Sequence, residues 1–528
     1  DLERLAYTDQ KVLDLFRRGE TAGVFQFESG GMRNLLMSMK PDRLEDLIAA
    51  NALYRPGPMD LIPDYNARKH GKQQVPKVHD VVSTYTNETY GIMVYQEQVM
   101  QIVHGLGGIP LRAAYTLIKA ISKKNQKAID DARGPFVQGA MNQGMTKDGA
   151  NELYDLILKF AGYGFNKSHS SGYAIVAYQT AYLKTYFPVQ YMAAVLTYES
   201  VSTEKVVEYI DECRRVMWPD GRRGIAVKPP DINLSEVGFS VVYEPGEVRD
   251  ANHGHIRFGL SAVKGVGEKA ILAIMAEREK NGPFKDLYEF CERVPSGAVN
   301  KSTMEALIKC GAFDSLHTTD KRAAMLEALE AAMQAGQRAA AARDAGQMSF
   351  FDSFAAAAPV ATAEKPSTLP STAAWSTNEL LKQEKSVLGF YISSHPLDQY
   401  RDPIERFANV SVADVKKLTA DAQVIVGGML TRVRPTFVKN GRSAGSKMAM
   451  VTIEDKTGSI DGVIFSDTYA VAAPLVTSDR MVFLKGKVDR RREEPSIVVE
   501  RVIDMENAAA ELTQAVNIVI EDTGSSDS

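Results

Sequence analysis

The hydrophobic pattern of this chain changes its period along the sequence, and this change limits the folds it can adopt. Over residues 1–210 apolar residues recur at the three- to four-residue spacing of amphipathic helices. Over residues 423–506 they alternate with polar residues, as in strands that are buried on one face. A chain of 528 residues is also too long for a single core. We therefore expect a multidomain α+β protein.

Breaks in composition divide the chain further. Residues 211–315 mix strand-like runs with helices, and residues 320–342 predict an alanine-rich helix. Residues 353–375 are rich in Ala, Pro, Ser and Thr, which is typical of a linker. Residues 423–506 contain five strand-like runs with a helix-sized insert at 468–476. This pattern favours a small Greek-key barrel of the oligonucleotide-binding (OB) type.

Proline and glycine mark where helices in the first 210 residues begin and end. Pro41 breaks one helical run, and Asp42 is placed to cap the next helix. The run ANELYDLILKFAGYG predicts a helix that ends at Gly162 or Gly164. The following helix should be interrupted at Pro188.

The loop between these last two helices reads FAGYGFNKSHSSGY. Its glycines, with Asn166, Lys167 and His169, are the residue types that bind phosphate at a helix N-terminus. The same polar residues also cap helices without any ligand. From composition alone, both interpretations remain open.

A second basic segment in the same region reads LIKAISKKNQK. Lys119 and Lys123 are four residues apart and share a helix face, and Lys124 follows directly. Such a run is usually a solvated surface. Its occurrence beside a glycine-rich loop makes it a candidate phosphate-binding surface.

The stretch LSAVKGVGEKAILAIMAER has the pattern of a helix-hairpin-helix. An apolar helix end precedes Gly265 and Gly267, and a second helix begins near Glu268. Glycine lets the backbone approach a DNA phosphate, the helix N-terminus favours the anion, and Lys264 and Lys269 flank the turn. The alternative is an αα-hairpin without a ligand.

Two further features suggest binding surfaces. The segment GQMSFFD places Gln347, Met348, Phe350 and Phe351 beside the linker, where they either dock on a partner or pack on their own domain. In the predicted barrel, aromatic and basic residues have the composition of a single-stranded nucleic-acid site, although such barrels also bind proteins. These residues are Arg432, Arg434, Phe437, Lys439 and Arg442.

Composition excludes several classes of function. The formal net charge is −4, so nucleic-acid binding must rest on local patches. Three cysteines without CxxC spacing indicate neither disulfides nor zinc, which fits a cytoplasmic protein. No apolar run reaches the roughly 18 residues of a membrane span, and no signal peptide opens the chain. The opening residues from Asp1 onward read as the middle of a domain, so we expect part of a longer protein.

The acidic residues do not form the cluster that a two-metal phosphoryl-transfer site requires. A P-loop and a serine-hydrolase motif are absent from the sequence as well. We therefore expect a chain that binds phosphates and bears no catalytic or metal-binding residues of its own.

Taken together, the motifs resemble those of the C-family replicative DNA polymerases, the bacterial DNA polymerase III alpha subunits. The resemblance covers essentially all of residues 1–510. The motifs that carry it, in family order and spacing, are TAGVFQFESGGM, LYRPGPM, TYGIMVYQEQVMQI, FAGYGFNKSHSSGYA, KPPDIN, GLSAVKGVGEKA and LGFYISSHPLD.

This resemblance implies a domain order. It comprises a palm exit helix and fingers (1–205), a domain for duplex DNA and the sliding clamp (206–352), a linker (353–375), a helical connector (376–422), an OB domain (423–506) and the start of a C-terminal domain (507–528). QMSFFD is similar to the family's internal clamp-binding motif. The implied nucleotide-binding residues are Lys119, Lys123, Lys124, Tyr163, Lys167 and His169.

The resemblance also implies partners and departures. The substrates are primer-template DNA and deoxynucleoside triphosphates, and two Mg²⁺ ions are bound by a palm domain outside this sequence. The epsilon exonuclease and the clamp-loader tau subunit bind other regions. Where many relatives have two arginines, this chain has Ile118 and Lys119, which puts one phosphate contact in doubt. The rival hypotheses are a non-catalytic DNA-binding accessory protein and, less favoured by the motifs, a tRNA-synthetase-like OB protein.

Overall fold

The computed structural model describes residues 1–344, 368–394, 396–438, 445–491 and 494–513. The chain divides into two compact units, Asp1–Ala374 and Trp375–Ser528. Each unit has its own buried core and is described by itself. In the described ranges, no helix is long and apolar enough to cross a membrane.

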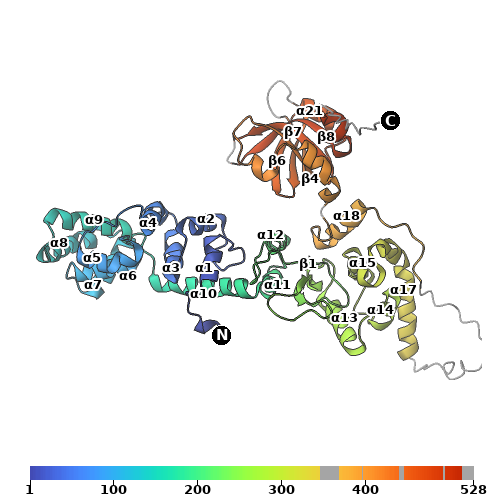
Figure 1. Ribbon diagram of the computed structural model, residues 1–528, viewed down its shortest axis with the longest axis horizontal. Helices are drawn as coiled ribbons and strands as arrows, with labels where there is room; N and C mark the ends of the chain where they lie inside the picture. The colour runs from blue at the N-terminus through green and yellow to red at the C-terminus, as the bar shows by residue number, and fades with distance from the viewer. Residues whose placement is uncertain (345–367, 395, 439–444, 492–493, 514–528) are drawn as a thin grey trace, which may run out of the picture. The chain divides into compact units, whose positions relative to one another are not determined.

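The first unit begins with helices that pack on one long helix, α10 (Lys167–Tyr186) (Figure 1). Helix α10 presents small residues, Ala174, Ala177 and Ala181, to the core, which lets neighbouring helices approach closely. The helices of this first core are α1 (Gln10–Arg17), α2 (Gly30–Met39), α3 (Leu44–Leu53) and α4 (Ile62–Lys69).

A second helical core follows in the same unit. Its buried residues come mainly from helices whose apolar positions recur at helical spacing, as the sequence predicts. These helices are α5 (Asp80–Thr86), α6 (Gln96–Gly105), α7 (Leu111–Ser122), α8 (Gln126–Asn142) and α9 (Lys147–Ala161).

The helix boundaries agree with the sequence except at Asp42. Helix α9 ends at Ala161 with Gly162 as its C-cap, and Pro188 opens α11 (Pro188–Tyr198). Asp42 does not cap α3; the N-cap is Arg43, which makes no side-chain capping bond. The Asp42 carboxylate instead pairs with Lys69 at 3.1 Å, so it is turned away from the helix N-terminus.

After α11 and α12 (Thr203–Cys213), a small sheet and a helical cluster complete the first unit. The strand-like runs of residues 227–267 are largely wrong as strand predictions, because the strands span only two or three residues. Pro229 and Pro230 donate no N–H, and the Asp231 carboxylate accepts from the N–H groups of Asn233 and Leu234 in a turn. The strands are β1 (Val227–Lys228), β2 (Ser240–Val242) and β3 (His255–Arg257), in the order β1-β3-β2.

The helical cluster contains the predicted glycine hairpin. Its second helix is α13 (Glu268–Asn281), but the helix before the turn is only a 3-10 turn, Leu260–Ala262, rather than the expected α-helix. The rest of the cluster consists of α14 (Leu287–Arg293), α15 (Lys301–Lys309) and the predicted alanine-rich helix α17 (Arg322–Asp344).

The second unit is a closed five-stranded barrel, in the order β4-β5-β6-β8-β7, with short helices packed around it. The expected insert is α21 (Ser466–Ala472). The helical first region, the mixed middle region and the barrel confirm the predicted α+β class. The elements are α18 (Thr377–Leu388), α19 (Arg401–Phe407), α20 (Val412–Val415), β4 (Gln423–Phe437), β5 (Lys447–Asp455), β6 (Gly458–Ile464), β7 (Met481–Asp489), β8 (Ser496–Asp504) and α22 (Ala508–Leu512).

Candidate functional site

A cavity of about 940 Å³ lies where three sequence motifs meet in the first unit. One wall is the loop of TAGVFQFESGGM, a second is Tyr54 and Arg55 of LYRPGPM, and a third is formed by Phe165, His169 and other residues at the start of α10. These motifs are separated by up to about 140 residues in sequence, so only folding brings them together.

Aromatic rings form a continuous series along this cavity. The ring centroids of Phe25 and Tyr173 are 5.3 Å apart, those of Tyr173 and His169 are 4.6 Å apart, and those of His169 and Phe165 are 5.5 Å apart. The Arg55 guanidinium lies 4.2 Å from the Phe165 ring centroid. Partly exposed rings of this kind provide stacking surfaces for planar groups such as nucleobases.

The charges of the cavity favour a neutral group over a triphosphate. Among the described residues that line it, Arg55 is the only lysine or arginine, and its guanidinium already donates to the carbonyls of Ala52 and Tyr163. Two carboxylates, Glu28 and Glu199, line the same space. A highly charged anion placed here would meet more negative than positive charge.

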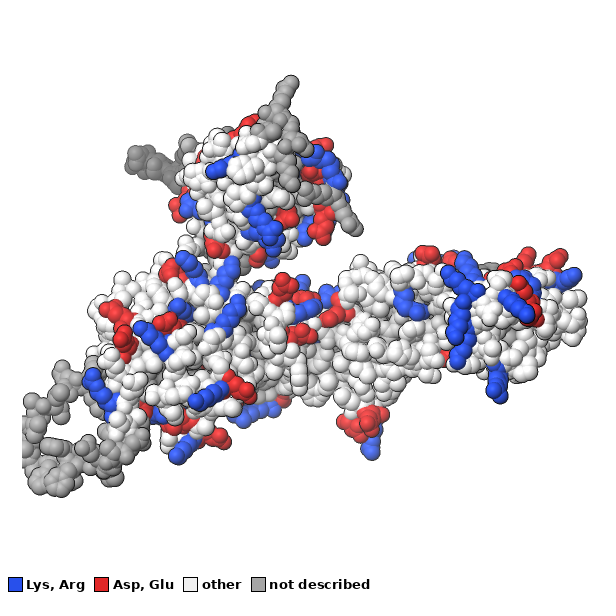
Figure 2. All heavy atoms as spheres, turned by 180° about the vertical axis from the view of Figure 1, so that it is seen from behind, with Lys and Arg blue, Asp and Glu red and all other residues white. Residues whose placement is uncertain are grey.

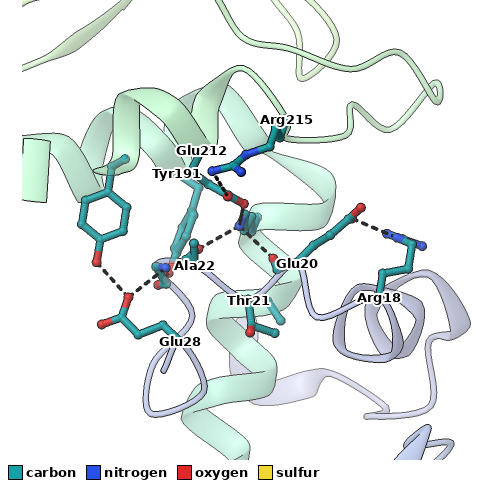
Figure 3. A network of polar contacts seen from close by, with 12 residues as sticks. Arg18, Glu20, Thr21, Ala22, Glu28, Tyr191, Glu212 and Arg215 are labelled. Carbon is teal, nitrogen blue, oxygen red and sulfur yellow. Dashed lines mark hydrogen bonds and ion pairs between the residues drawn. The ribbon is translucent and has the colours of Figure 1, made fainter. Parts of the chain in front are cut away.

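The loop that carries Phe25 is held at several points by the helices behind it (Figure 3). The Tyr191 hydroxyl donates to the Gly23 carbonyl at 2.6 Å. The Glu28 carboxylate accepts from the Gly23 N–H and from the Tyr209 hydroxyl, at 3.1 and 2.8 Å. Burial and the adjacent Glu28 carboxylate raise the pKa of Tyr209, which keeps it a donor.

The groups proposed to bind phosphate in the GFNKSH loop are occupied within the protein. The Asn166 side chain accepts from the His169 N–H at 2.8 Å, which is the capping interpretation of this loop. The Glu97 carboxylate accepts from the Lys167 N–H, and the Lys167 ammonium pairs with Glu88 at 2.8 Å. The geometry therefore favours capping over phosphate binding at the N-terminus of α10.

Tyr163 does not line the cavity that contains the aromatic series. Its side chain is 54% exposed, and its ring packs so closely on Gly57 that a Cβ there would lie 2.8 Å from it. Gly57 has a φ of +99°, and Arg55 holds the Tyr163 carbonyl. Tyr163 also lines a separate cavity of about 150 Å³ with Lys159 and Gly164.

The lysines of the LIKAISKK segment are exposed, and Ile118 is not. Lys119, Lys123 and Lys124 make no side-chain hydrogen bond or ion pair with the residues that the structure describes, and the Lys119 ammonium lies 4.4 Å from the centroid of the Tyr115 ring. Ile118 is 2% exposed and belongs to the second helical core. Ile118 therefore packs inward, and the neighbouring Lys119 keeps its charge at the surface.

The glycine hairpin presents open backbone at the start of α13. Gly265 has a φ of +87°, and its carbonyl accepts from the Thr303 hydroxyl at 3.0 Å. Gly267 is the N-cap of α13, and no described atom lies within 4 Å of a Cβ built on it. The Lys269 ammonium donates to the Gly297 carbonyl at 3.0 Å, and Lys264 is exposed. An anion could approach this helix end closely.

The predicted barrel surface lies on the outer half of β4. Arg432 and Arg434 alternate with the half-buried Val433 as exposed residues after a bulge, and Phe437, three positions beyond Arg434, is 59% exposed. In the register of the β4–β5 pair, Arg434 stands opposite Met450, which is also exposed. Lys439 and Arg442, and the QMSFFD residues Gln347, Met348, Phe350 and Phe351, lie outside the described residues.

Sequence reasoning missed four residues of the cavity: Phe25, Gln26, Arg55 and Tyr173. The available signal was the aromatic pair around Gln26 in a loop bounded by glycines. Gln26 has a φ of +64°, a backbone conformation that non-glycine residues rarely adopt and that clusters at functional sites.

Charge and metal-binding geometry give no second candidate. Acidic and basic side chains are interspersed over the visible face of the molecule (Figure 2). Among the described residues, no group of three or more His, Cys, Asp or Glu side chains is placed to hold a metal ion.

Comparison with known families identifies three regions of the chain. The bacterial DNA polymerase III alpha subunit finger domain matches residues 1–144. A helix-hairpin-helix motif matches residues 224–324, and an OB-fold nucleic acid binding domain matches residues 424–505. The third match coincides with the closed barrel.

Curated relatives match nearly the whole chain, and each is named DNA polymerase III subunit alpha. The protein from Pseudomonas aeruginosa is 37% identical over 98% of this chain and 44% of its own length. That from Bacillus subtilis is 36% identical over 99% of this chain and 44% of its own length. The protein from Thermus aquaticus is 39% identical over 93% of this chain and 38% of its own length. The chain thus spans less than half the length of these relatives.

Proposed function

Because this chain belongs to the family of bacterial DNA polymerase III alpha subunits, we propose that it takes part in DNA-templated DNA synthesis in the 5′ to 3′ direction. The observation that carries the proposal is the 36–39% identity to these subunits over 93–99% of the chain. The three matched regions have the order fingers, helix-hairpin-helix and OB fold. The chain would supply substrate-binding surfaces to a nucleotidyl transferase.

We propose that the first helical region binds the incoming deoxynucleoside triphosphate. The exposed Lys119, Lys123 and Lys124, whose ammonium groups make no hydrogen bond or ion pair with the described residues, are suited to the triphosphate. Tyr163 lies on the loop between α9 and α10, and His169, in the first turn of α10, belongs to the aromatic series of the cavity. The aromatic series is suited to a base, and Lys167 serves chiefly to hold the loop through Glu88.

We propose two further nucleic-acid surfaces. The open backbone at Gly265 and Gly267, with Lys264 and Lys269, would grip a phosphate of duplex DNA without reading its sequence. The outer half of β4, with Arg432, Arg434 and Phe437, would bind single-stranded template by charge and stacking. Lys439 and Arg442 belong to the same proposed surface by sequence.

The remaining partners are proposals from the family resemblance alone. Gln347, Met348, Phe350 and Phe351 would bind the beta sliding clamp. The epsilon exonuclease and the tau subunit would bind parts of the relatives that this chain does not match. The two Mg²⁺ ions of nucleotidyl transfer would likewise be held by that unmatched part, and a cytoplasmic location follows from a role in replication.

The test of the nucleotide proposal is steady-state kinetics of a full-length subunit that contains this region. Lys119→Ala combined with Lys123→Ala should raise the KM for nucleotide at least tenfold, since each lost charged contact to phosphate weakens binding. Arg112→Ala with Lys147→Ala, which removes two other charges of the same region, is the control. An unchanged KM in the Lys119/Lys123 variant would reject the assignment.

The rival hypothesis of a non-catalytic accessory protein predicts a different result. A protein of that kind would bind DNA but would not support nucleotide incorporation when placed in a full-length subunit. The names of the relatives favour the polymerase. The tRNA-synthetase-like alternative is not favoured, because residues 1–144 match a polymerase finger domain.

A further inference from the structure

A buried lysine, Lys184 of α10, binds the base of the loop that lines the cavity. The Lys184 ammonium donates to the carbonyls of Glu20 and Ala22, at 2.9 and 2.7 Å, and to the Glu212 carboxylate at 2.7 Å. The side chain of Lys184 is 3% exposed and that of Glu212 is 10% exposed. The three bonds satisfy all three donors of the ammonium group.

Stability alone does not explain a buried ion pair. Removing two charges from water is costly, and a well-packed apolar pair of similar volume is often as stable or more stable. Burial lowers the pKa of Lys184, and the attraction of Glu212 opposes this effect. What an apolar pair cannot do is hold two backbone carbonyls, and these are the groups that Lys184 binds.

The two carbonyls fix the start of the loop whose tip faces the cavity. Beyond Ala22, the backbone N–H groups of four loop residues have partners. The Gly23 N–H donates to the Glu28 carboxylate at 3.1 Å. The Val24 N–H donates to Thr21, the Phe25 N–H donates to the Thr180 hydroxyl at 3.2 Å, and the Phe27 N–H donates to Val24. The loop is therefore held at its base by Lys184 and at its tip by α10.

We propose that Lys184 is a positioning residue: by binding the carbonyls of Glu20 and Ala22 while paired with Glu212, it sets where Phe25 and Gln26 stand in the cavity. Lys184 lies in α10, as do His169 and Tyr173 of the aromatic series, so one rigid helix sets both walls. The consequence for nucleotide binding rests on the proposed function; the positioning itself does not.

The experiment compares three variants of the chain. In Lys184→Met with Glu212→Leu, the site stays filled by apolar groups but the carbonyls lose their donor. In Glu212→Gln, an amide oxygen still accepts from Lys184, so the carbonyl bonds are retained. The matched control is Lys69→Met with Asp46→Leu, which removes another buried ion pair of the first unit, 2.8 Å long.

The first readout is amide hydrogen exchange of Gly23–Phe27 in the purified chain. We expect exchange at least tenfold faster in the Lys184/Glu212 double variant, wild-type exchange in Glu212→Gln, and no change at Gly23–Phe27 in the control. Protected amides of Ala174–Ala181 in α10 should stay as slow as in the wild type, which distinguishes local loosening from unfolding. Unchanged exchange at Gly23–Phe27 in the double variant would overturn the proposal.

The second readout is kinetics in a full-length subunit. We expect the double variant to raise the KM for nucleotide at least fivefold with kcat within twofold of the wild type. Faster exchange at Gly23–Phe27 with an unchanged KM would show that the position of the loop does not affect nucleotide binding. That result would overturn the proposed consequence for the substrate. If the wild-type subunit incorporated no nucleotide at all, the proposed function would fail, and the exchange result would still decide the positioning role.

Discussion

Both carboxylate oxygens of Glu97 accept from the single backbone N–H of Lys167, at 3.1 and 3.0 Å, in a bifurcated hydrogen bond. Glu97 thereby occupies the N-terminus of α10, the place where a phosphate would otherwise bind. Negative charge at this end of a helix is favourable, so the protein satisfies the helix dipole internally. The phosphates of a nucleotide must then be bound by other groups, and the exposed lysines of α7 are available for this.

Replacing Glu97 should affect folding rather than substrate. Glu97→Gln removes a charge-assisted bond at the helix N-terminus, and we expect the free energy of unfolding to fall by about 1 kcal/mol. Urea denaturation of the chain measures this. The nucleotide KM of a full-length subunit should stay unchanged. A lower KM with unchanged stability would show that Glu97 competes with substrate and would contradict this interpretation.

Gly267→Ala should separate DNA binding from stability at the glycine hairpin. A Cβ at Gly267 meets no described atom within 4 Å, and its φ is −83°, so the folded chain should tolerate alanine. The methyl group would instead block the approach of a phosphate to α13. We expect duplex DNA affinity to fall about tenfold, or about 1.4 kcal/mol, with an unchanged melting temperature.

Gly134→Ala is the control for this hairpin test. Gly134 is exposed within α8 and also has no atom within 4 Å of an added Cβ. Fluorescence anisotropy with a labelled duplex measures both variants. Equal affinity of the wild type and Gly267→Ala would argue that the hairpin does not contact DNA.

The second unit, residues 375–528, should bind single-stranded DNA through β4. Arg432→Ala with Arg434→Ala should reduce the slope of log affinity against log salt by about 1.4, since each phosphate contact on a single strand contributes about 0.7. Phe437→Ala should weaken binding by about 1–3 kcal/mol with little change in slope, because stacking is not ionic. Arg401→Ala with Lys417→Ala, which removes the same charge from other elements, is the control. Binding of all three variants like the wild type would reject β4 as the surface.

The free energy of unfolding should fall at acidic pH through His255. Burial, with the nearby Lys228 and Arg257 cations, lowers the pKa of His255 to about 4. The Arg257 guanidinium lies 3.3 Å from His255 Nε2, where it needs a neutral imidazole acceptor. Unfolded histidine has a pKa of about 6.5, so between pH 6.5 and 4 the unfolded chain binds a proton that the folded chain does not.

Stability contributed by neutral His255 is thus complete above pH 6.5 and is lost as the pH falls toward 4. We expect a loss on the order of 2 kcal/mol across this window. Urea denaturation at several pH values should show a shallower pH dependence in His255→Gln than in the wild type. His104→Gln, at an exposed histidine, should keep the wild-type dependence; identical curves for all three proteins would contradict the assignment.

Individual elements show how far the sequence predicts the fold. The helix ending at Ala161, the start of α11 at Pro188 and the five-stranded barrel follow from periodicity and from Pro and Gly. The prediction that Asp42 caps α3 was wrong, because Lys69, 27 residues away in sequence, pairs with its carboxylate. The prediction of an α-helix before Gly265 was wrong, because an apolar run of that length also fits a single 3-10 turn.

By itself, the sequence determined the types of element and their order, because these depend on backbone geometry over a few residues. The resemblance to a polymerase family rests on the order of short motifs, which is also local information. Only the tertiary structure decided which polar groups remain available to a ligand. The sequence makes Lys167 a candidate phosphate ligand. In the structure its ammonium pairs with Glu88 and its backbone N–H donates to Glu97, about 80 and 70 residues earlier in the chain. The aromatic cavity and the bond from Lys184 to the carbonyl of Glu20, 164 residues apart, arise in the same way. A charged group binds its nearest partner in space, and local patterns in a sequence do not contain that distance.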